Sequence, residues 1–406
     1  MAGVEPSARG VFRVPSYTFF WLARVFSALS YQMLGVAFGW QIYALTHSTF
    51  ALGMVGLAQF LPLLLLILIV GHVADRVDRR RILAVCRALE ALTSAALAAA
   101  SLTNHIRPAG IFLGVAVIGA ARAFENPSTQ AMVPNLVSED LVPQAIAWSS
   151  SANQTASIIG PALGGLLYVA GPEVVYAAAS LLFVSATALL LGVRLWRPVA
   201  VRNFASATSI FSGIHYIRDH KNILGAISLD LFAVLLGGAT ALLPAYAHDI
   251  LHTGPWGLGL LRLSPALGAL ATSVIVAHHP IRKHAGMRMF FAVIVFGLAT
   301  VGFAFSRSVW LSMAILAVMG GADVVSVVIR STLVQLETPD EMRGRVSAVN
   351  TLFIGTSNQL GEFESGVTAS WFGLIPATVF GGMGSIVVAL VWMQLFPGLR
   401  KLDRLS

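Results

Sequence analysis

Apolar segments of about 20 residues recur along the 406-residue chain, and they limit its fold more than any other feature. A helix of this length crosses the hydrocarbon core of a bilayer, and lipid offers no partners to unpaired backbone groups. The sequence therefore predicts an all-α integral membrane protein with twelve transmembrane helices. The expected spans are residues 17–45, 50–71, 82–103, 109–126, 143–170, 174–193, 222–248, 256–277, 288–305, 308–335, 345–370 and 375–395.

Composition excludes the main alternatives. The chain is 57% hydrophobic and only 11% charged, whereas a soluble domain averages about 25% charged residues. Too few charges are present to cover a water-exposed surface, which excludes a soluble enzyme and a disordered protein. A single cysteine, Cys86, excludes a disulfide scaffold. The net charge of +8 comes from short basic loops, so it indicates membrane topology rather than nucleic-acid binding.

One long polar stretch, residues 194–221, divides the spans into two sets of six. We expect an N-terminal six-helix bundle over 1–193, a linker over 194–221 and a C-terminal six-helix bundle over 222–406. Within the linker, Ile210, Phe211, Ile214 and Ile217 recur at helical spacing. This pattern favours an amphipathic helix on the cytoplasmic surface over a plain polar linker.

The basic residues of the loops predict the orientation. Nearly all of them fall in the N-terminus, the even-numbered loops and the C-terminus, whereas the odd-numbered loops hold only Arg107 and Arg307. Both termini are therefore expected in the cytoplasm. The first apolar run is longer than a signal-peptide core, so we interpret it as an uncleaved span. We expect a multi-pass protein of the cell membrane, of the bacterial inner-membrane type.

A faint internal repeat supports the division into halves. A shift of 201 residues pairs Gly160 with Gly361 and Gly165 with Gly366. The same shift pairs the acidic residues at 139–140 with those at 340–341. Related halves are common in transporters, although some of these identities arise by chance in a chain rich in Gly and Ala.

The loop between spans 2 and 3 reads GHVADRVDRRR over residues 71–81. It resembles the G-x-L-A-D-R-x-G-R-R signature of the major facilitator superfamily, with Val73 for Leu and Asp78 for the second Gly. The resemblance implies a fold of two six-helix bundles and a cytoplasmic latch between them. Asp75 would accept hydrogen bonds at the start of span 11, and Arg79 would pair with Glu125. The residues expected in this latch are Gly71, Asp75, Arg76, Arg79, Arg80 and Glu125.

The basic residues of this loop allow a second interpretation. Arg79, Arg80 and Arg81 serve equally well as topology charges without any latch. An acid in a basic loop has no such use, so Asp75 favours the latch.

Span 5 contains GPALGG, formed by Gly160, Pro161, Gly164 and Gly165 with two residues between. It resembles the antiporter motif of exporters in the same superfamily, although Ala147 and Ala156 stand where the fuller pattern has glycines. Proline bends a helix and glycine lets a neighbouring helix approach closely. Ordinary small-residue packing is the alternative.

Two further stretches, 126–147 and 338–350, resemble the branch that contains enterobactin exporters and macrolide-efflux proteins. The resemblance covers nearly the whole chain. It implies a secondary active transporter that expels amphiphilic, drug-like or siderophore-like molecules by alternating access. An importer of a small metabolite on the same fold remains the alternative.

Acidic residues deep in the spans are candidates for proton coupling, because a charge inside a membrane is costly. Asp323 lies on span 10, and Glu362 and Glu364 lie on span 11. Only one of the last two can face inward, since they are two residues apart. A static interhelical salt bridge is the alternative for each. Structural pairing or snorkelling is favoured for Arg24, Arg87, Glu90, Arg122, Glu125, Asp230, Asp249, Arg262 and Arg330.

A substrate cavity is expected between spans 1 and 11, with contacts from Tyr31, Gln32, Asn358 and Gln359, although core packing suits each of them as well. No nucleophile–base set, metal-ligand spacing or phosphate-binding loop occurs. We therefore expect no enzyme activity, no cofactor and no metal. The expected partners are a small molecule, protons and the bilayer, with no nucleic acid and a monomeric chain. A passive channel or a scaffold is a further alternative. The expected latch argues against both, because neither alternates between two conformations.

Overall fold

A computed structural model describes residues 10–194, 207–281 and 283–403, apart from the side chains at 67, 68, 71, 72, 74, 75 and 207–210. Long helices dominate the described chain, as expected for an all-α membrane protein. The first six are α1 (Pro15–Thr46), α2 (Thr49–Arg76), α3 (Arg79–Leu102), α4 (Pro108–Met132), α5 (Val142–Tyr168) and α6 (Pro172–Gly192). After the linker follow α7 (Ala207–Asp219), α8 (Lys221–Leu236), α10 (Pro255–His278), α11 (Ala285–Phe305), α12 (Val309–Glu337), α13 (Asp340–Phe372) and α14 (Leu374–Leu395).

Nine segments of the described chain are long and apolar enough to cross a membrane. The helices α1, α5 and α13 are 32, 27 and 33 residues long but are not among the nine. Polar residues lower their hydropathy, for example the run Ser149–Ser150–Ser151 in α5. The membrane-embedded, multi-helix architecture is confirmed, while the count of twelve spans stays a prediction.

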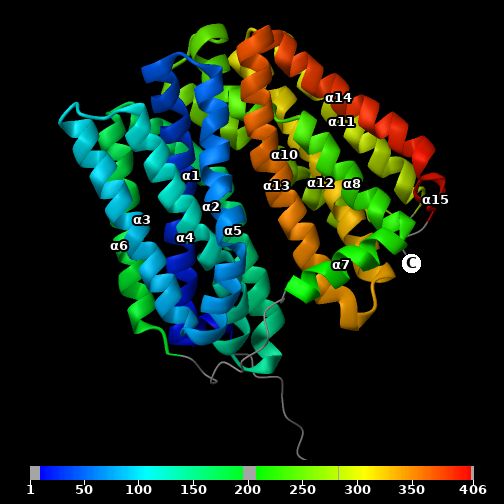
Figure 1. Ribbon diagram of the computed structural model, residues 1–406, viewed down its shortest axis with the longest axis horizontal. Coiled ribbons are helices and arrows are strands. Elements are labelled where there is room, and N and C mark those ends of the chain that lie inside the picture. Colours follow the sequence, from blue (N-terminus) through cyan, green and yellow to red (C-terminus); the bar gives the residue numbers. More distant parts are fainter. Residues whose placement is uncertain (1–9, 195–206, 282, 404–406) are drawn as a thin grey trace, which may run out of the picture.

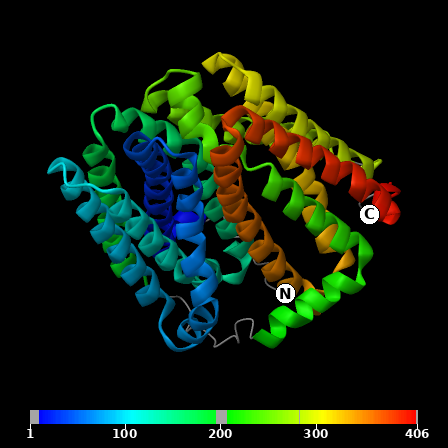
Figure 2. The same cartoon turned by 45° about the horizontal axis from the view of Figure 1, so that its top comes forward.

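The helices pack in two sets (Figures 1 and 2). In the first set, α1 packs on α5 and α6, α3 on α4 and α6, and α2 on α4. In the second, α10 and α11 pack on α12, α14 packs on α11, and α8 packs on α13 and α14. The main contacts between the sets are α2 with α13 and α5 with α10. The boundary residues of the expected bundles stay a prediction.

We call the helix ends where α6 stops and α7 begins the linker face, and the other ends the opposite face. The two sets meet mainly near the opposite face. A Cβ at Gly165 would lie 2.6 Å from the carbonyl oxygen of Pro255, and one at Gly53 would lie 2.9 Å from that of Phe363. Toward the linker face α2 and α13 separate (Figure 1), and a Cβ at Gly344 would meet no described neighbour within 4 Å. The two sets are therefore closed together on the opposite face and apart on the linker face.

A polar contact joins the two sets at the opposite face. The Tyr43 hydroxyl of α1 donates to the carboxylate of Asp249, and His248 lies 2.6 Å from the same carboxylate. Asp249 belongs to a π-helical turn, Tyr246–Ile250.

That turn ends a segment whose irregular backbone is not apparent from its hydropathy. The expected span 222–248 is interrupted after Leu236 by Gly237 and Gly238, and continues as the 3-10 turn Ala239–Leu242, the short α9 (Leu243–Ala245) and the π-turn. The physical reason is close approach, since a Cβ at Gly238 would lie 2.5 Å from the carbonyl oxygen of Gly361.

The linker helix expected around Ile214 is present as α7, which packs on α8 and α13. Ile217 is buried and Phe211 is exposed, while the side chain of Ile210 lies outside the described residues. Gly213 of α7 packs directly on the backbone of Arg345 at the start of α13.

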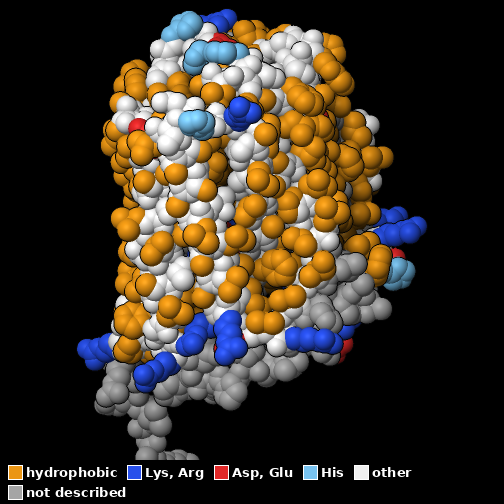
Figure 3. All heavy atoms as spheres, turned by 60° about the vertical axis from the view of Figure 1, so that its left-hand side comes forward, with side chains coloured by type: hydrophobic (Ala, Val, Ile, Leu, Met, Phe, Trp, Pro, Cys, Tyr) orange, Lys and Arg blue, Asp and Glu red, His pale blue; other side chains and the backbone are white. Residues whose placement is uncertain are grey.

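The surface is divided along the helix axes (Figure 3). Hydrophobic side chains cover the middle of the face shown, and Lys and Arg side chains gather along the linker face. Several histidines lie at the opposite face. This distribution suits a protein surrounded by lipid with a basic rim on one side.

A buried ion pair holds the second set together. Arg330 of α12 contacts the carboxylate of Asp230 of α8, and both side chains are buried. Replacing Asp230 with Asn should lower the free energy of unfolding by about 3–5 kcal/mol, because it leaves a buried guanidinium without its counter-charge. Thermal unfolding of the purified chain in detergent measures the loss.

The control for this prediction is Asp219→Asn. Asp219 is an exposed carboxylate at the end of α7 whose pairing with His215 is open to water, so its loss should change stability little. Equal stability of the Asp230 variant and the parent chain would contradict the prediction.

Candidate functional site

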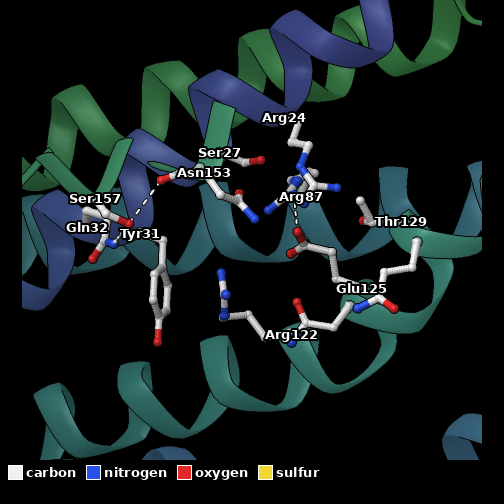
Figure 4. Close-up of a pocket in the computed structure, with 13 residues that line it drawn as sticks. Arg24, Ser27, Tyr31, Gln32, Arg87, Arg122, Glu125, Thr129, Asn153 and Ser157 are labelled. Carbon is white, nitrogen blue, oxygen red and sulfur yellow. Dashed lines mark hydrogen bonds and ion pairs between the residues drawn. The ribbon is translucent and has the colours of Figure 1, made fainter. Parts of the chain in front are cut away.

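A polar cavity of about 250 Å³ lies among α1, α3, α4 and α5, toward the linker face (Figure 4). Every residue that lines it belongs to the first set of helices. Three arginines and one carboxylate carry its charges, and amides and hydroxyls supply most of the remaining wall. The lining residues are Arg24, Ser27, Ala28, Tyr31, Gln32, Arg87, Arg122, Glu125, Asn126, Thr129, Gln130, Asn153 and Ser157.

One of the arginines is fully neutralised. Arg87 on α3 donates to Glu125 on α4 and, at 2.9 Å, to Glu90 one turn along its own helix. All three side chains are buried. The expectation of structural pairing holds for Arg87, Glu90 and Glu125, and the pairing fixes α3 against α4 at one wall of the cavity.

A second arginine is held by an aromatic ring. The guanidinium carbon of Arg122 lies 3.6 Å from the centre of the Tyr31 ring, and the Tyr31 hydroxyl accepts a hydrogen bond from Gln59 of α2. This cation–π contact uses the face of the guanidinium and leaves its N–H groups, which lie in its plane, for other partners.

The remaining wall is made of short polar groups. Gln32 donates to the hydroxyl of Ser157 at 2.9 Å, and that hydroxyl donates to the carbonyl oxygen of Asn153 at 2.9 Å. The Nε of Arg24 is buried and has no hydrogen-bond partner among the described residues.

The four residues expected to form a cavity do not share one. Tyr31 and Gln32 line the cavity, whereas Asn358 and Gln359 are not among its lining residues. Asn358 is exposed and donates to Ile354 of its own helix. A Cβ at Gly56 of α2 would lie 3.0 Å from the carbonyl oxygen of Gln359, so Gln359 lies where the two sets of helices meet.

Of the three acidic candidates, Glu362 is placed by close packing in the contact between the sets. A Cβ at Gly56 would lie 2.8 Å from the Glu362 Cβ, so Glu362 packs directly on α2. Arg262 of α10 enters the same contact from the second set. Its guanidinium packs on α1, 3.0 Å from a Cβ at Gly35 and 3.2 Å from one at Gly39.

The other two acidic candidates lie elsewhere. Asp323 borders a small cavity inside the second set, together with Asp230, Phe296 and Ser326. Glu364 accepts a hydrogen bond from Thr368 of its own helix at 2.7 Å.

The hydrogen bonds described for Arg79 and Arg80 of the expected latch lie within the first set of helices and the segment that follows it. The side chain of Asp75 and the position of a Cβ on Gly71 lie outside the described residues. Arg79 donates to the carbonyl oxygen of Ala131 at 3.3 Å, and Arg80 donates to that of Val193 at 2.7 Å. Arg76 is exposed. Glu125 pairs with Arg87, so the described partner of this carboxylate differs from the expected Arg79.

The glycine motif of α5 lies where three helices meet. Cβ atoms at Gly160 and Gly164 would collide with Gln32 and Met33 of α1, at 2.5 and 2.9 Å. Gly165 packs on Gly259 of α10, and a Cβ at Gly259 would lie 2.7 Å from the carbonyl oxygen of Pro161. The motif therefore provides close packing within the first set and between the sets. Its role in export stays a prediction.

Sequence reasoning missed the arginines of the cavity as site residues. Arg24, Arg87 and Arg122 lie in the half of their helices nearest the linker face, which is why pairing or snorkelling was expected for them. No local pattern in the sequence distinguishes Arg87, which pairs with two carboxylates, from the other two arginines.

A family model described as a transmembrane secretion effector, of the major facilitator type, matches residues 5–405. The chain belongs to this family. Members of this major facilitator family are multi-pass membrane transporters of small molecules.

Individual relatives agree with the family. The chain is 27% identical to the enterobactin exporter EntS of Citrobacter koseri, over 95% of this chain and 93% of that one. It is 26% identical to EntS of Salmonella typhimurium, over 95% and 94%.

Solved structures share the fold. A bacterial homologue of the human lysosomal transporter Spinster, in an inward-facing and unoccupied conformation, matches with a TM-score of 0.75 and 13% identity, over 97% of each chain. The nucleoside transporter NupG matches with a TM-score of 0.71 and 15% identity, over 94% of this chain and 99% of that one. These likenesses show the fold of the transporter.

Proposed function

We propose that this transporter expels an amphiphilic small molecule, drug-like or siderophore-like, by proton-coupled alternating access. The observation that carries the proposal is the similarity to enterobactin exporters over nearly the full length of both chains. The glycine motif of α5, which resembles a motif of exporters, also supports transport out of the cell. Substrate would occupy the polar cavity among α1, α3, α4 and α5.

The basic rim supports placing the linker face in the cytoplasm, together with both termini. The membrane would then be the bacterial inner membrane. With this orientation the cavity lies toward the cytoplasm and the closed contact faces outward. The described arrangement would accept a solute from the cytoplasm, and rocking of the two sets would release it outside.

Glu362 is the proposed proton carrier. It is the acidic candidate placed at the contact between the sets, and Arg262 is the nearby cation of the same contact. A carboxylate at that place meets a different environment whenever the sets move. Its proton affinity would therefore follow the conformation, which is the requirement for coupling.

Import of a metabolite on the same fold is the alternative, since the nucleoside transporter NupG has this architecture. A deletion strain is first tested for hypersensitivity to a panel of toxic amphiphiles and for siderophore retention. Inverted vesicles with an acidic interior are then given each compound that the panel identifies. Accumulation inside supports export, whereas accumulation only in right-side-out vesicles supports import.

The latch gives a separate prediction. Asp75→Asn should reduce transport about tenfold, because an amide loses the charge that favours binding at a helix N-terminus, while binding of the solute stays unchanged. The control is Asp78→Asn in the same turn, since Asp78 caps α3 by accepting from the backbone of Arg80. Equal vesicle transport by Asp75→Asn and the parent chain would rule out the latch.

A further inference from the structure

The cavity has an unbalanced charge. Arg87 engages both nearby carboxylates, Glu90 and Glu125. No described carboxylate lies within ion-pair distance of Arg24 or Arg122, the other two arginines of the wall. The described groups around the cavity thus hold three cations and two anions.

The excess positive charge is accessible to a ligand, because Arg24 and Arg122 are only half-buried and the lining residues Asn126 and Asn153 are exposed. The Tyr31 ring lies against Arg122, and Arg24 has a buried Nε with no described partner. Both guanidinium groups can therefore form charge-assisted hydrogen bonds with an anion that enters the cavity.

The shape and the other lining groups narrow the ligand further. Asn126, Gln130 and Asn153 offer amide donors, and Ser27 and Thr129 offer hydroxyls. Figure 4 shows Arg24, Arg87 and Arg122 grouped around Glu125, with Tyr31 beside Arg122. A closed apolar cavity of about 150 Å³ holds one benzene ring, so a small acidic ring fits within the volume of about 250 Å³.

We propose that the cavity binds the acidic end of the solute, a carboxylate or phenolate on a single aromatic ring, through Arg24 and Arg122. Tyr31 is a positioning residue that holds the Arg122 guanidinium flat. A larger solute would insert one acidic ring and leave the rest outside the cavity. This inference rests on the proposed function only in taking the cavity as the substrate site.

The test uses salicylate and salicylamide, which have nearly the same shape but differ in charge. Binding of each to the purified full-length chain in nanodiscs is measured by calorimetry. Hydrogen bonds to charged groups contribute about 1.5–3 kcal/mol, so salicylate should bind at least about tenfold more tightly than salicylamide. Arg24→Gln and Arg122→Gln should each lose about tenfold in salicylate affinity and leave salicylamide unchanged.

Two variants control for folding and position. Arg122→Lys keeps the charge and should retain part of the affinity, while Arg107→Gln changes an exposed arginine on the opposite face and should retain all of it. Equal affinity for the two probes, no salicylate binding, or undiminished binding by both Gln variants would overturn the proposal. The binding measurement depends neither on the direction of transport nor on proton coupling. Salicylate binding without export from vesicles would therefore contradict the proposed function and still support this inference.

Discussion

Transport driven by a pH gradient should fall by about tenfold or more in Glu362→Gln, because an amide cannot carry the coupling proton. Exchange of solute for solute across the same membrane should persist, since it needs no net proton movement. The measurement is pH-driven uptake into inverted vesicles beside equilibrium exchange in proteoliposomes. Exchange is the informative readout, because a variant that merely misfolds would lose both activities.

The matched control is Glu364→Gln on the same helix. Glu364 is two residues away and bonds to Thr368 of its own helix, so its neutral variant should keep pH-driven transport. Glu362→Asp, which keeps the carboxylate, should restore part of the activity. Normal pH-driven transport by Glu362→Gln, or its loss in the Glu364 variant instead, would assign the proton to another group.

Gly259→Leu should prevent closure on the opposite face. Even a Cβ added at Gly259 would lie only 2.7 Å from the carbonyl oxygen of Pro161 and 3.1 Å from the Cα of Gly165. Backbone atoms on both sides cannot move aside as a flexible side chain does. Overpacking of this kind costs about 1–3 kcal/mol, enough to change the ratio of two conformations by about tenfold or more.

Thiol labelling measures that shift. Ser157→Cys places a thiol in the cavity, and Cys86 is the chain's own single, buried cysteine. A membrane-impermeant reagent applied at the linker face should label Ser157→Cys rapidly in the parent background and about tenfold more slowly with Gly259→Leu. Gly110→Leu is the control, because Gly110, like Gly259, lies toward the opposite face, but it is exposed and has open space around it. Unchanged labelling with Gly259→Leu would show that these glycines do not set the conformation.

Much of the architecture could be predicted from the sequence, because length and hydropathy are direct consequences of a lipid solvent. The long helices follow from them, and the linker helix α7 follows from the helical spacing of its apolar residues. The interruption at Gly237 and Gly238 does not, since Gly238 is required by the close approach of the Gly361 backbone, which the local sequence does not reveal. The helices α1, α5 and α13 form where spans were expected, although their polar residues leave them out of the nine segments apolar enough to cross a membrane.

The candidate site could be predicted only in part. Tyr31 and Gln32 were expected in a cavity and line one, but their expected partners on α13 do not. Local pattern places a residue on a helix face, and the rotation of one set of helices against the other decides which faces meet. Arg24 and Arg122 were missed because an arginine in a span looks the same in sequence whether a carboxylate neutralises it or not.

All residues that line the cavity belong to the first set of helices, so a solute bound there would move together with that set. It would make nearly the same contacts before and after the sets rock, and a ligand with equal affinity for two states shifts neither. Binding of the solute alone would therefore not favour the outward-facing or the inward-facing conformation. Under the proposed mechanism the bias enters where the sets touch, at Arg262 and Glu362, so the residues that bind the solute are separate from the residues that drive its movement.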